Sequence, residues 1–249
     1  MNRFFQGMMY LIMGLRTLST KGLKRFIILP IAFNLLLFSG LFYLIYYYLS
    51  PYTYYYLDKL PSWLGFLSWV FFVLFAISFL VVFFLMFTVM FNIVAAPFNG
   101  LLAEKTQKLL YNSAIPSLSF TQIALRSIKR QGQFLGYFLP RLVIIGILFF
   151  IPFIHPVYPI IWFVFAAWML GMQYQDFAMD NNLIGFQEMR EKIKNNKMQS
   201  LGFGSLINII SFIPLLNILT MPAAVIGSVI MYCEENKIKS EAPLLIKTQ

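Results

Sequence analysis

Four long stretches without a single charged residue dominate this sequence. They cover residues 26–57, 60–103, 142–175 and 198–233, and they are 32, 44, 34 and 36 residues long. Each is longer than the roughly 18–20 apolar residues that mark a helix able to cross a bilayer. Only 11% of the 249 residues are charged, whereas a soluble globular domain carries about 25%. The stretches therefore predict an integral membrane protein.

Helices are the expected spanning elements, because the hydrocarbon core of a bilayer satisfies no backbone hydrogen bond. Strands of a membrane barrel would alternate polar and apolar residues in segments of about ten, and the stretch FLVVFFLMF at 79–87 does not alternate. A cleavable signal peptide is not expected, since the first apolar stretch is longer than the 7–15 residues of such a segment. We expect one all-α membrane domain over residues 1–249.

The basic residues gather in two parts of the chain. Residues 1–25 carry five Lys or Arg and no acid, and residues 104–141 carry six basic residues and one acid. Because cytoplasmic loops of membrane proteins are enriched in Lys and Arg, we expect both segments to be cytoplasmic. The stretches 26–57 and 60–103 are then full transmembrane spans. The second, at about 66 Å as a helix, must tilt or project beyond the bilayer.

Prolines interrupt the other two apolar stretches. Only ten residues of the third stretch precede its first proline, which corresponds to about 15 Å of helix, half of a hydrocarbon core of about 30 Å. Because prolines break helix interiors, two interpretations stay open: kinked full spans, or helical hairpins that enter the membrane and return to the same face. The prolines are Pro152, Pro156 and Pro159 in 142–175, and Pro214 and Pro222 in 198–233.

The hairpin interpretation is favoured because it keeps the charged segment 176–197 on the same side as the other basic segments. Both termini are then cytoplasmic. Non-helical backbone at membrane depth is tolerated only next to protein or a water-filled cavity. Two proline-broken hairpins, at 142–175 and 198–233, therefore imply an oligomer or a pore.

The segment 104–141 is both basic and amphipathic. Its second half alternates apolar residues with Arg126, Lys129 and Arg130. One interpretation is a cytoplasmic helix that lies on anionic lipid headgroups. The other is a basic surface that guides an anion toward a pore.

The residues that most catalytic sites need are scarce. His155 is the only histidine and Cys233 the only cysteine, so a typical zinc site cannot form. The apolar stretches contain no carboxylate, although proton-driven transporters often place one inside a span. A membrane enzyme would have to use Asp176, Asp180 and Arg141. We expect no enzyme, no cofactor and no nucleic-acid partner.

The stretch TLSTKGLKRFIILP, at 17–30, places three cations at the edge of the first apolar run. Ser19 and Thr20 are favoured N-cap residues, so a helix is expected to start just after them. Its first N–H groups and positive dipole end would meet Lys21, Lys24 and Arg25 with no acid nearby. Such a combination suits sulfate or phosphate. The residues alone leave a second possibility open, a simple cytoplasmic anchor.

Five segments of the chain resemble, in order, the CysZ family of bacterial sulfate permeases. They are GLKRFIILP at 22–30, AAPFNGLLAE at 95–104, LPR at 139–141, WMLGMQYQDFAMDN at 168–181 and IPLLNILTMPAAVIG at 213–227. The resemblance implies an inner-membrane protein that admits sulfate for cysteine biosynthesis. It also implies two long transmembrane helices and two pairs of half-penetrating helices, assembled as a homo-oligomer among membrane lipids.

The anion-binding motif of this family falls on Gly22, Leu23, Lys24 and Arg25, which are the expected sulfate site. Lys24 stands where arginine also occurs in the family, and lysine offers a point charge instead of a planar fork. Without a carboxylate at depth, a channel is expected in preference to a coupled pump. The alternative is a membrane scaffold or lipid-binding protein that transports nothing.

Overall fold

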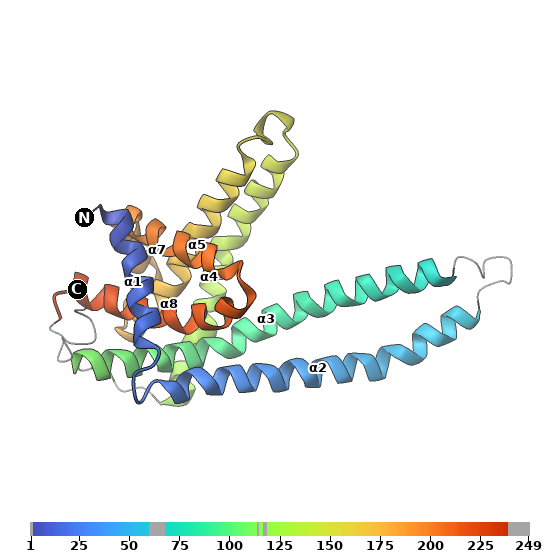
Figure 1. Cartoon of the computed structure of the whole chain (residues 1–249), viewed down its shortest axis with the longest axis horizontal. Coiled ribbons are helices and arrows are strands. Elements are labelled where there is room, and N and C mark those ends of the chain that lie inside the picture. The colour runs from blue at the N-terminus through green and yellow to red at the C-terminus, as the bar shows by residue number, and fades with distance from the viewer. Residues whose placement is uncertain (1, 60–67, 114, 117–118, 239–249) are drawn as a thin grey trace. The chain divides into compact units, whose positions relative to one another are not determined.

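The computed structural model of this chain describes residues 2–59, 68–113, 115, 116 and 119–238. All secondary structure in these residues is helical, which confirms the all-α fold class. The elements in chain order are α1 (Arg3–Thr17), α2 (Lys24–Asp58), α3 (Ser68–Tyr111), α4 (Phe120–Phe149), the short 3-10 helix η2 (Pro152–Ile154), α5 (Tyr158–Asn181), α6 (Phe186–Asn195), α7 (Lys197–Ser211) and α8 (Pro214–Glu235) (Figure 1).

The chain divides into two compact units. The two-helix unit, Leu29–Ala95, consists of most of α2 and α3, and the core unit consists of Met1–Ile28 and Ala96–Gln249. The single membrane domain expected from the sequence stays a prediction, because the division into units does not show where a bilayer would lie.

Aromatic side chains join the two long helices of the two-helix unit. Phe83 of α3 is almost fully buried and packs edge-to-face against Phe38 and Phe42 of α2, with ring centroids 5.1 and 5.8 Å apart. Edge-to-face pairs at this distance contribute about 0.5–1.5 kcal/mol beyond the area that they bury. Within this unit α2 and α3 therefore run side by side as one layer (Figure 1).

One helical segment of the described residues, Thr121–Phe149, is long and apolar enough to cross a membrane. It belongs to α4, which is one continuous helix from Phe120 to Phe149. The boundary that the sequence analysis placed at residue 141, between the basic segment and the third apolar stretch, therefore lies inside this helix. The expected spans 26–57 and 60–103 coincide largely with α2 and α3, which have 35 and 44 residues. Residues 60–67 lie outside the described part of the chain.

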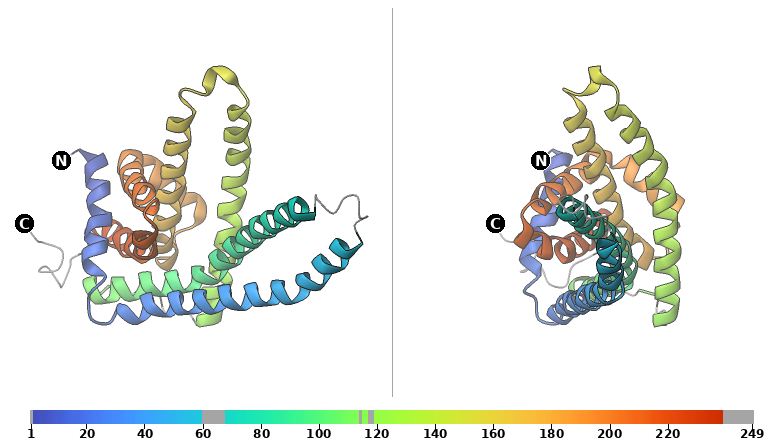
Figure 2. Two further views of the ribbon diagram at one scale, coloured as in Figure 1. Left: turned by 45° about the vertical axis from the view of Figure 1, so that its right-hand side comes forward. Right: turned by 90° about the vertical axis from the view of Figure 1, so that its right-hand side faces the viewer.

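The helix of the third apolar stretch ends where its prolines lie. α4 ends at Phe149, η2 starts with Pro152, and α5 starts at Tyr158 with Pro159 in its first turn. A proline fits the first turn because its missing N–H would have no partner there. Figure 2 shows that the chain turns back at this point, so that α4 and α5 form a hairpin.

The fourth stretch is interrupted once, and the expected break at Pro222 is wrong. α7 ends at Ser211 and α8 begins at Pro214, but Pro222 lies inside α8. A proline inside a helix removes one backbone hydrogen bond and adds a steric clash. Pro222 is buried, and the fully buried residues that follow it pack into the core. This packing holds the helix together across the proline.

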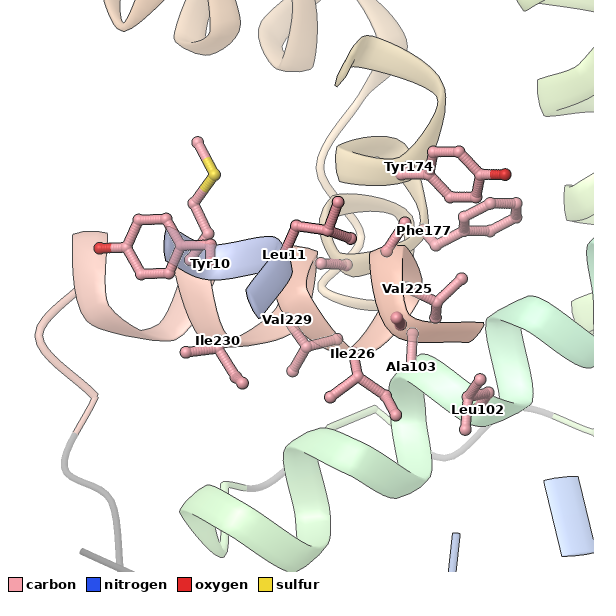
Figure 3. Close-up of a cluster of buried hydrophobic side chains, with 14 of the residues drawn as sticks. Tyr10, Leu11, Leu102, Ala103, Tyr174, Phe177, Val225, Ile226, Val229 and Ile230 are labelled. Carbon is pink, nitrogen blue, oxygen red and sulfur yellow. The ribbon is translucent and has the colours of Figure 1, made fainter. Parts of the chain in front are cut away.

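The core of the core unit is built around α8. Val225, Ile226, Val229 and Ile230 of α8 are fully buried and belong to one cluster with side chains of α1, α3 and α5 (Figure 3). These partners include Tyr10 and Leu11 from α1, Leu102 and Ala103 from α3, and Tyr174 and Phe177 from α5. With Phe203 and Ile207 of α7, side chains from five helices thus make one continuous core.

Glycines let α7 approach its neighbours at backbone distance. A Cβ at Gly202 would overlap the carbonyl oxygen of Phe4 in α1, and a Cβ at Gly204 would overlap the carbonyl oxygen of Ala167 in α5. Small residues at such crossings give van der Waals contact between backbones, which is the main attraction between helices in lipid. α7 therefore packs closely between α1 and α5.

Polar contacts tie the start of the chain to its last helix. The Tyr10 hydroxyl donates to Glu234 at 2.8 Å, and the Arg3 guanidinium donates to Asn196 at 3.2 Å. Burial, together with the carboxylate of Glu234, raises the pKa of Tyr10, so this hydroxyl keeps its proton. α1 is thus fixed against α8 and the start of α7.

Candidate functional site

The helix at the predicted anion site starts later than the sequence indicated. α2 begins at Lys24, although Ser19 and Thr20 were expected to cap it. Gly22 explains the difference, because its φ of +97° lies outside the helical region. The N–H of Leu23 donates to the carbonyl of Thr20 at 3.2 Å, so that amide already has an acceptor. The first amide of α2 left for a ligand is that of Lys24.

The core holds the turn before α2 in place. The side chain of Leu23 is 0% exposed and belongs to the same cluster as Leu102 and Leu110 of α3. A Cβ on Gly22 would lie 3.3 Å from Leu109 of α3. Leu23 is therefore an anchor of the turn, and its side chain is not available to a ligand.

The cations of this corner face solvent without an acidic partner. Lys21 and Lys24 are exposed, and no carboxylate of the described residues pairs with either of them. Glu104, an acid near the end of α3, pairs with Lys108. The Lys24 N–H, at the first position of α2, has no acceptor among the described residues. The side chain of Arg25 lies outside the described residues.

This arrangement concentrates positive charge at the start of a helix. The dipole of α2 adds partial positive charge to that of Lys24, and these like charges repel each other. A bound anion would offset this repulsion. The corner can therefore bind a small anion by a free amide and an ammonium group. Of the four residues predicted for the site, the structure brings Gly22, Leu23 and Lys24 together with the backbone of Arg25.

A second charged cluster joins α4 to the end of α5. Arg130 donates through Nε to Asp176 at 2.7 Å, and Arg126 donates through Nη2 to Asp180 at 2.7 Å. Arg130 also donates through Nη2 to the carbonyl of Ile184 at 3.0 Å. These ion pairs turn both arginine side chains toward α5. The interfacial helix expected for this segment stays a prediction.

The sequence contained a signal for this cluster. Arg126 and Arg130 are four residues apart, as are Asp176 and Asp180, and residues four apart lie on the same face of a helix. Two such pairs of opposite charge match when the helices pack side by side. Arg141, which was grouped with the two aspartates as a candidate enzyme site, instead contacts the ring of Tyr137.

Burial shifts the titration of the cluster. Asp176 is among the buried residues, and loss of hydration raises the pKa of its carboxyl to about 7, although the Arg130 guanidinium acts in the opposite direction. Arg130 thus favours the charged form of this carboxyl and opposes part of the effect of burial. Among the described residues, no three Asp, Glu, His or Cys side chains cluster as a metal site.

Replacing Arg130 with methionine is expected to destabilise the protein by about 3 kcal/mol at pH 8, because the buried Asp176 carboxyl, which is ionised in the unfolded chain, must then either stay charged without a partner or take up a proton. The folded pKa of Asp176 would rise further above its unfolded value near 4. The folded state would then bind a proton that the unfolded state lacks, and stability would fall as pH rises. Melting curves in detergent from pH 5 to pH 8 measure this difference.

The control for this prediction is Lys194→Met, which removes an exposed cation of α6. It should leave the melting temperature nearly unchanged at both pH values. An Arg130→Met protein that melts like the parent at pH 8 would contradict the role given to this ion pair.

Comparisons with known proteins agree with the motifs. Residues 10–222 match the family described as sulfate transporter CysZ/etoposide-induced protein 2.4. The chain is 38% identical over 226 residues to the protein named sulfate transporter CysZ of Pectobacterium atrosepticum, covering 89% of this chain and 82% of that protein. It is 38% identical over 233 residues to the protein of the same name from Pseudomonas fluorescens, covering 92% and 93%. The chain therefore belongs to the CysZ sulfate transporter family.

Proposed function

We propose that this chain is a sulfate permease of the bacterial inner membrane, which admits sulfate for assimilation into cysteine. The observation that carries the proposal is the start of α2. There the exposed Lys24 and a free helix amide stand without an acidic partner among the described residues. Relatives that are 38% identical over about nine tenths of the chain bear the name sulfate transporter.

The proposed sulfate site consists of Gly22, Leu23, Lys24 and Arg25, with different tasks. Gly22 allows the turn that ends at the first helical residue, and Leu23 fixes that turn in the core. The Lys24 ammonium and amide would hold the sulfate oxygens, and Arg25 would add a second cation. Charge-assisted hydrogen bonds of this kind are about twice as strong as neutral ones.

In the proposed membrane arrangement, α2 and α3 are the two long spans, and the pairs α4/α5 and α7/α8 are half-penetrating hairpins. The tip of the first pair supports this assignment, because Phe150 and Phe153 are 81% and 93% exposed there. Phenylalanines at a helical turn fit hydrocarbon better than water. Both termini would be cytoplasmic, and the hairpins would meet other protomers of a homo-oligomer.

A channel is the proposed mode of transport. Entry of a dianion against an inside-negative potential of 100 mV costs about 4.6 kcal/mol, at roughly 2.3 kcal/mol per charge. A channel can overcome this only when intracellular consumption keeps the sulfate concentration inside low. A coupled pump would need a titratable group at depth, and the apolar stretches contain no carboxylate.

Uptake of radiolabelled sulfate into proteoliposomes tests the proposal. We expect uptake that needs no proton or sodium gradient, and an imposed inside-negative potential of about 100 mV should lower the final inside-to-outside ratio about two thousandfold. A ratio that stays high against this potential would contradict a channel. The absence of any flux would favour the alternative, a scaffold or lipid-binding protein whose basic residues hold anionic headgroups.

A further inference from the structure

A cavity of about 270 Å³ lies between α4 and the turn that joins α5 to α6. Its wall contains three cationic side chains and one carboxylate, that of Asp180. None of these residues belongs to the proposed sulfate site at the start of α2, so a role for this cavity is independent of that site. The full lining is Arg126, Lys129, Arg130, Gln133, Asp180, Leu183, Ile184, Gly185 and Phe186.

The two arginines of this wall keep hydrogen-bond donors that the ion pairs do not use. Arg130 is only 8% exposed, and it bonds through Nε and Nη2. Its Nη1 donates to no described residue. Arg126 bonds through Nη2 alone, which leaves Nε and Nη1. A guanidinium has five N–H donors in a fixed plane, so the cavity contains donors that are aligned and still available.

Two more polar side chains of α4 complete this face. Lys129 and Gln133 are exposed at the cavity, and neither has a hydrogen-bond or ion-pair partner among the described residues. With Arg126 and Arg130 they lie on one face of α4, at intervals of three and four residues. Asp176 does not line the cavity but pairs with Arg130. When Asp176 and Asp180 are both counted, the three cations still leave a net charge of +1 at the cavity.

The backbone opposite α4 adds amide donors. α6 starts at Phe186, its N-cap residue is Gly185, and no side chain caps its first amides. Both residues line the cavity. The ring of Phe186 lies 5.5 Å from the Arg130 guanidinium carbon and shields one side of that group from water.

We infer that this cavity is a second oxyanion site, which takes a tetrahedral phosphate or sulfate group from a free ion or a lipid headgroup. Arg130 and Arg126 would donate to its oxygens from the inner wall, Lys129 would close the outer side, and the first amides of α6 would face it. Asp176 and Asp180 would hold the two guanidinium groups in place, since a binding group needs supporting hydrogen bonds that fix its geometry.

Hydrogen exchange of the full-length protein tests this inference locally. Because the Lys24→Glu/Arg25→Glu background removes the other proposed site, the test is made in that background. Inorganic sulfate or phosphate is expected to slow exchange at residues 185–188. Lys129→Glu should weaken this effect at least about tenfold in apparent affinity, because it replaces a charge-assisted hydrogen bond with repulsion. Lys129→Gln should give a smaller loss.

Lys194→Glu is the matched control, since it reverses an exposed cation of α6 outside the cavity. It should leave the anion effect as in the parent. If both reversals weaken binding equally, the effect comes from net charge and the inference is wrong. It is also wrong if Lys129→Glu binds like the parent.

A second experiment distinguishes a lipid headgroup from a free ion as the source of the oxyanion. The protein is placed in nanodiscs of phosphatidylglycerol or of phosphatidylcholine, without added sulfate or phosphate. Slower exchange at 185–188 only in phosphatidylglycerol, lost in Lys129→Glu, would identify a lipid headgroup as the occupant. Protection by the free ions alone would identify a soluble oxyanion. If neither lipid nor free ion protects these amides, the cavity is not an oxyanion site.

Discussion

Vesicles that contain the Lys24→Glu/Arg25→Glu protein are expected to take up sulfate at the rate of vesicles without protein. The double change places two carboxylates where the proposed site holds a dianion, next to a helix start that already lacks a neutralising acid among the described residues. The double change removes two favourable contacts with the ion and adds two repulsive ones. The binding free energy lost in this way exceeds the roughly 4 kcal/mol that corresponds to a millimolar affinity.

The folded state should survive this change. Lys24 is exposed and has no partner among the described residues, and carboxylates are favourable in the first turn of a helix. The melting temperature of the double variant is therefore expected to equal or exceed that of the parent. Leu23, which anchors the turn, is left in place.

The matched control reverses two exposed cations elsewhere, with Lys194→Glu and Lys197→Glu. It makes the same change in net charge and should transport sulfate at the parental rate. Normal uptake by a well-folded Lys24→Glu/Arg25→Glu protein would remove the site from the start of α2. Equal loss in the control would show that overall charge attracts the ion, with no site at that position.

Replacing Gly204 with leucine is expected to prevent the core unit from reaching its native packing. Even a Cβ at this position would overlap the carbonyl oxygen of Ala167, and the rest of a leucine side chain would push α7 away from α5. Overpacking by this amount is expected to lower the free energy of unfolding by more than about 4 kcal/mol. Size-exclusion profiles and melting curves in detergent measure the loss.

Gly136→Ala provides the comparison, because nothing lies within 4 Å of a Cβ at that position in α4. Alanine is the better helix former by about 1 kcal/mol, so this variant should melt at the same temperature as the parent or slightly higher. Gly204→Ala should fall between the two. A Gly204→Leu protein as stable as the parent would mean that α5 and α7 do not touch as described.

The sequence predicted the helices better than their ends. The charge-free stretches led directly to an all-α protein, and the prolines near residue 152 lie where α4 ends. Pro222 shows the limit of this reasoning, because a proline breaks a helix only when nothing else holds the two halves together. Its neighbours Ala223 and Ala224 are fully buried, which a pattern of single residues does not reveal.

The start of α2 was predicted three residues too early, since the cap preference of Ser19 and Thr20 was given more weight than Gly22. A glycine at positive φ ends the turn and determines where the helix can begin. The pairing of Arg126 and Arg130 with Asp176 and Asp180 was missed for another reason. Matching charges in helices about 50 residues apart show a contact only once the packing of those helices is known.

The ties between α1 and α8 have a consequence for biosynthesis. Tyr10 and its partner Glu234 are separated by 224 positions, and Gly202, which receives the backbone of Phe4, also lies near the end of the chain. A nascent chain leaves the ribosome from its amino terminus, so α1 is made long before α7 and α8, the helices that it packs against. Removal of α7 and α8 should thus leave α1 unprotected and open to proteases.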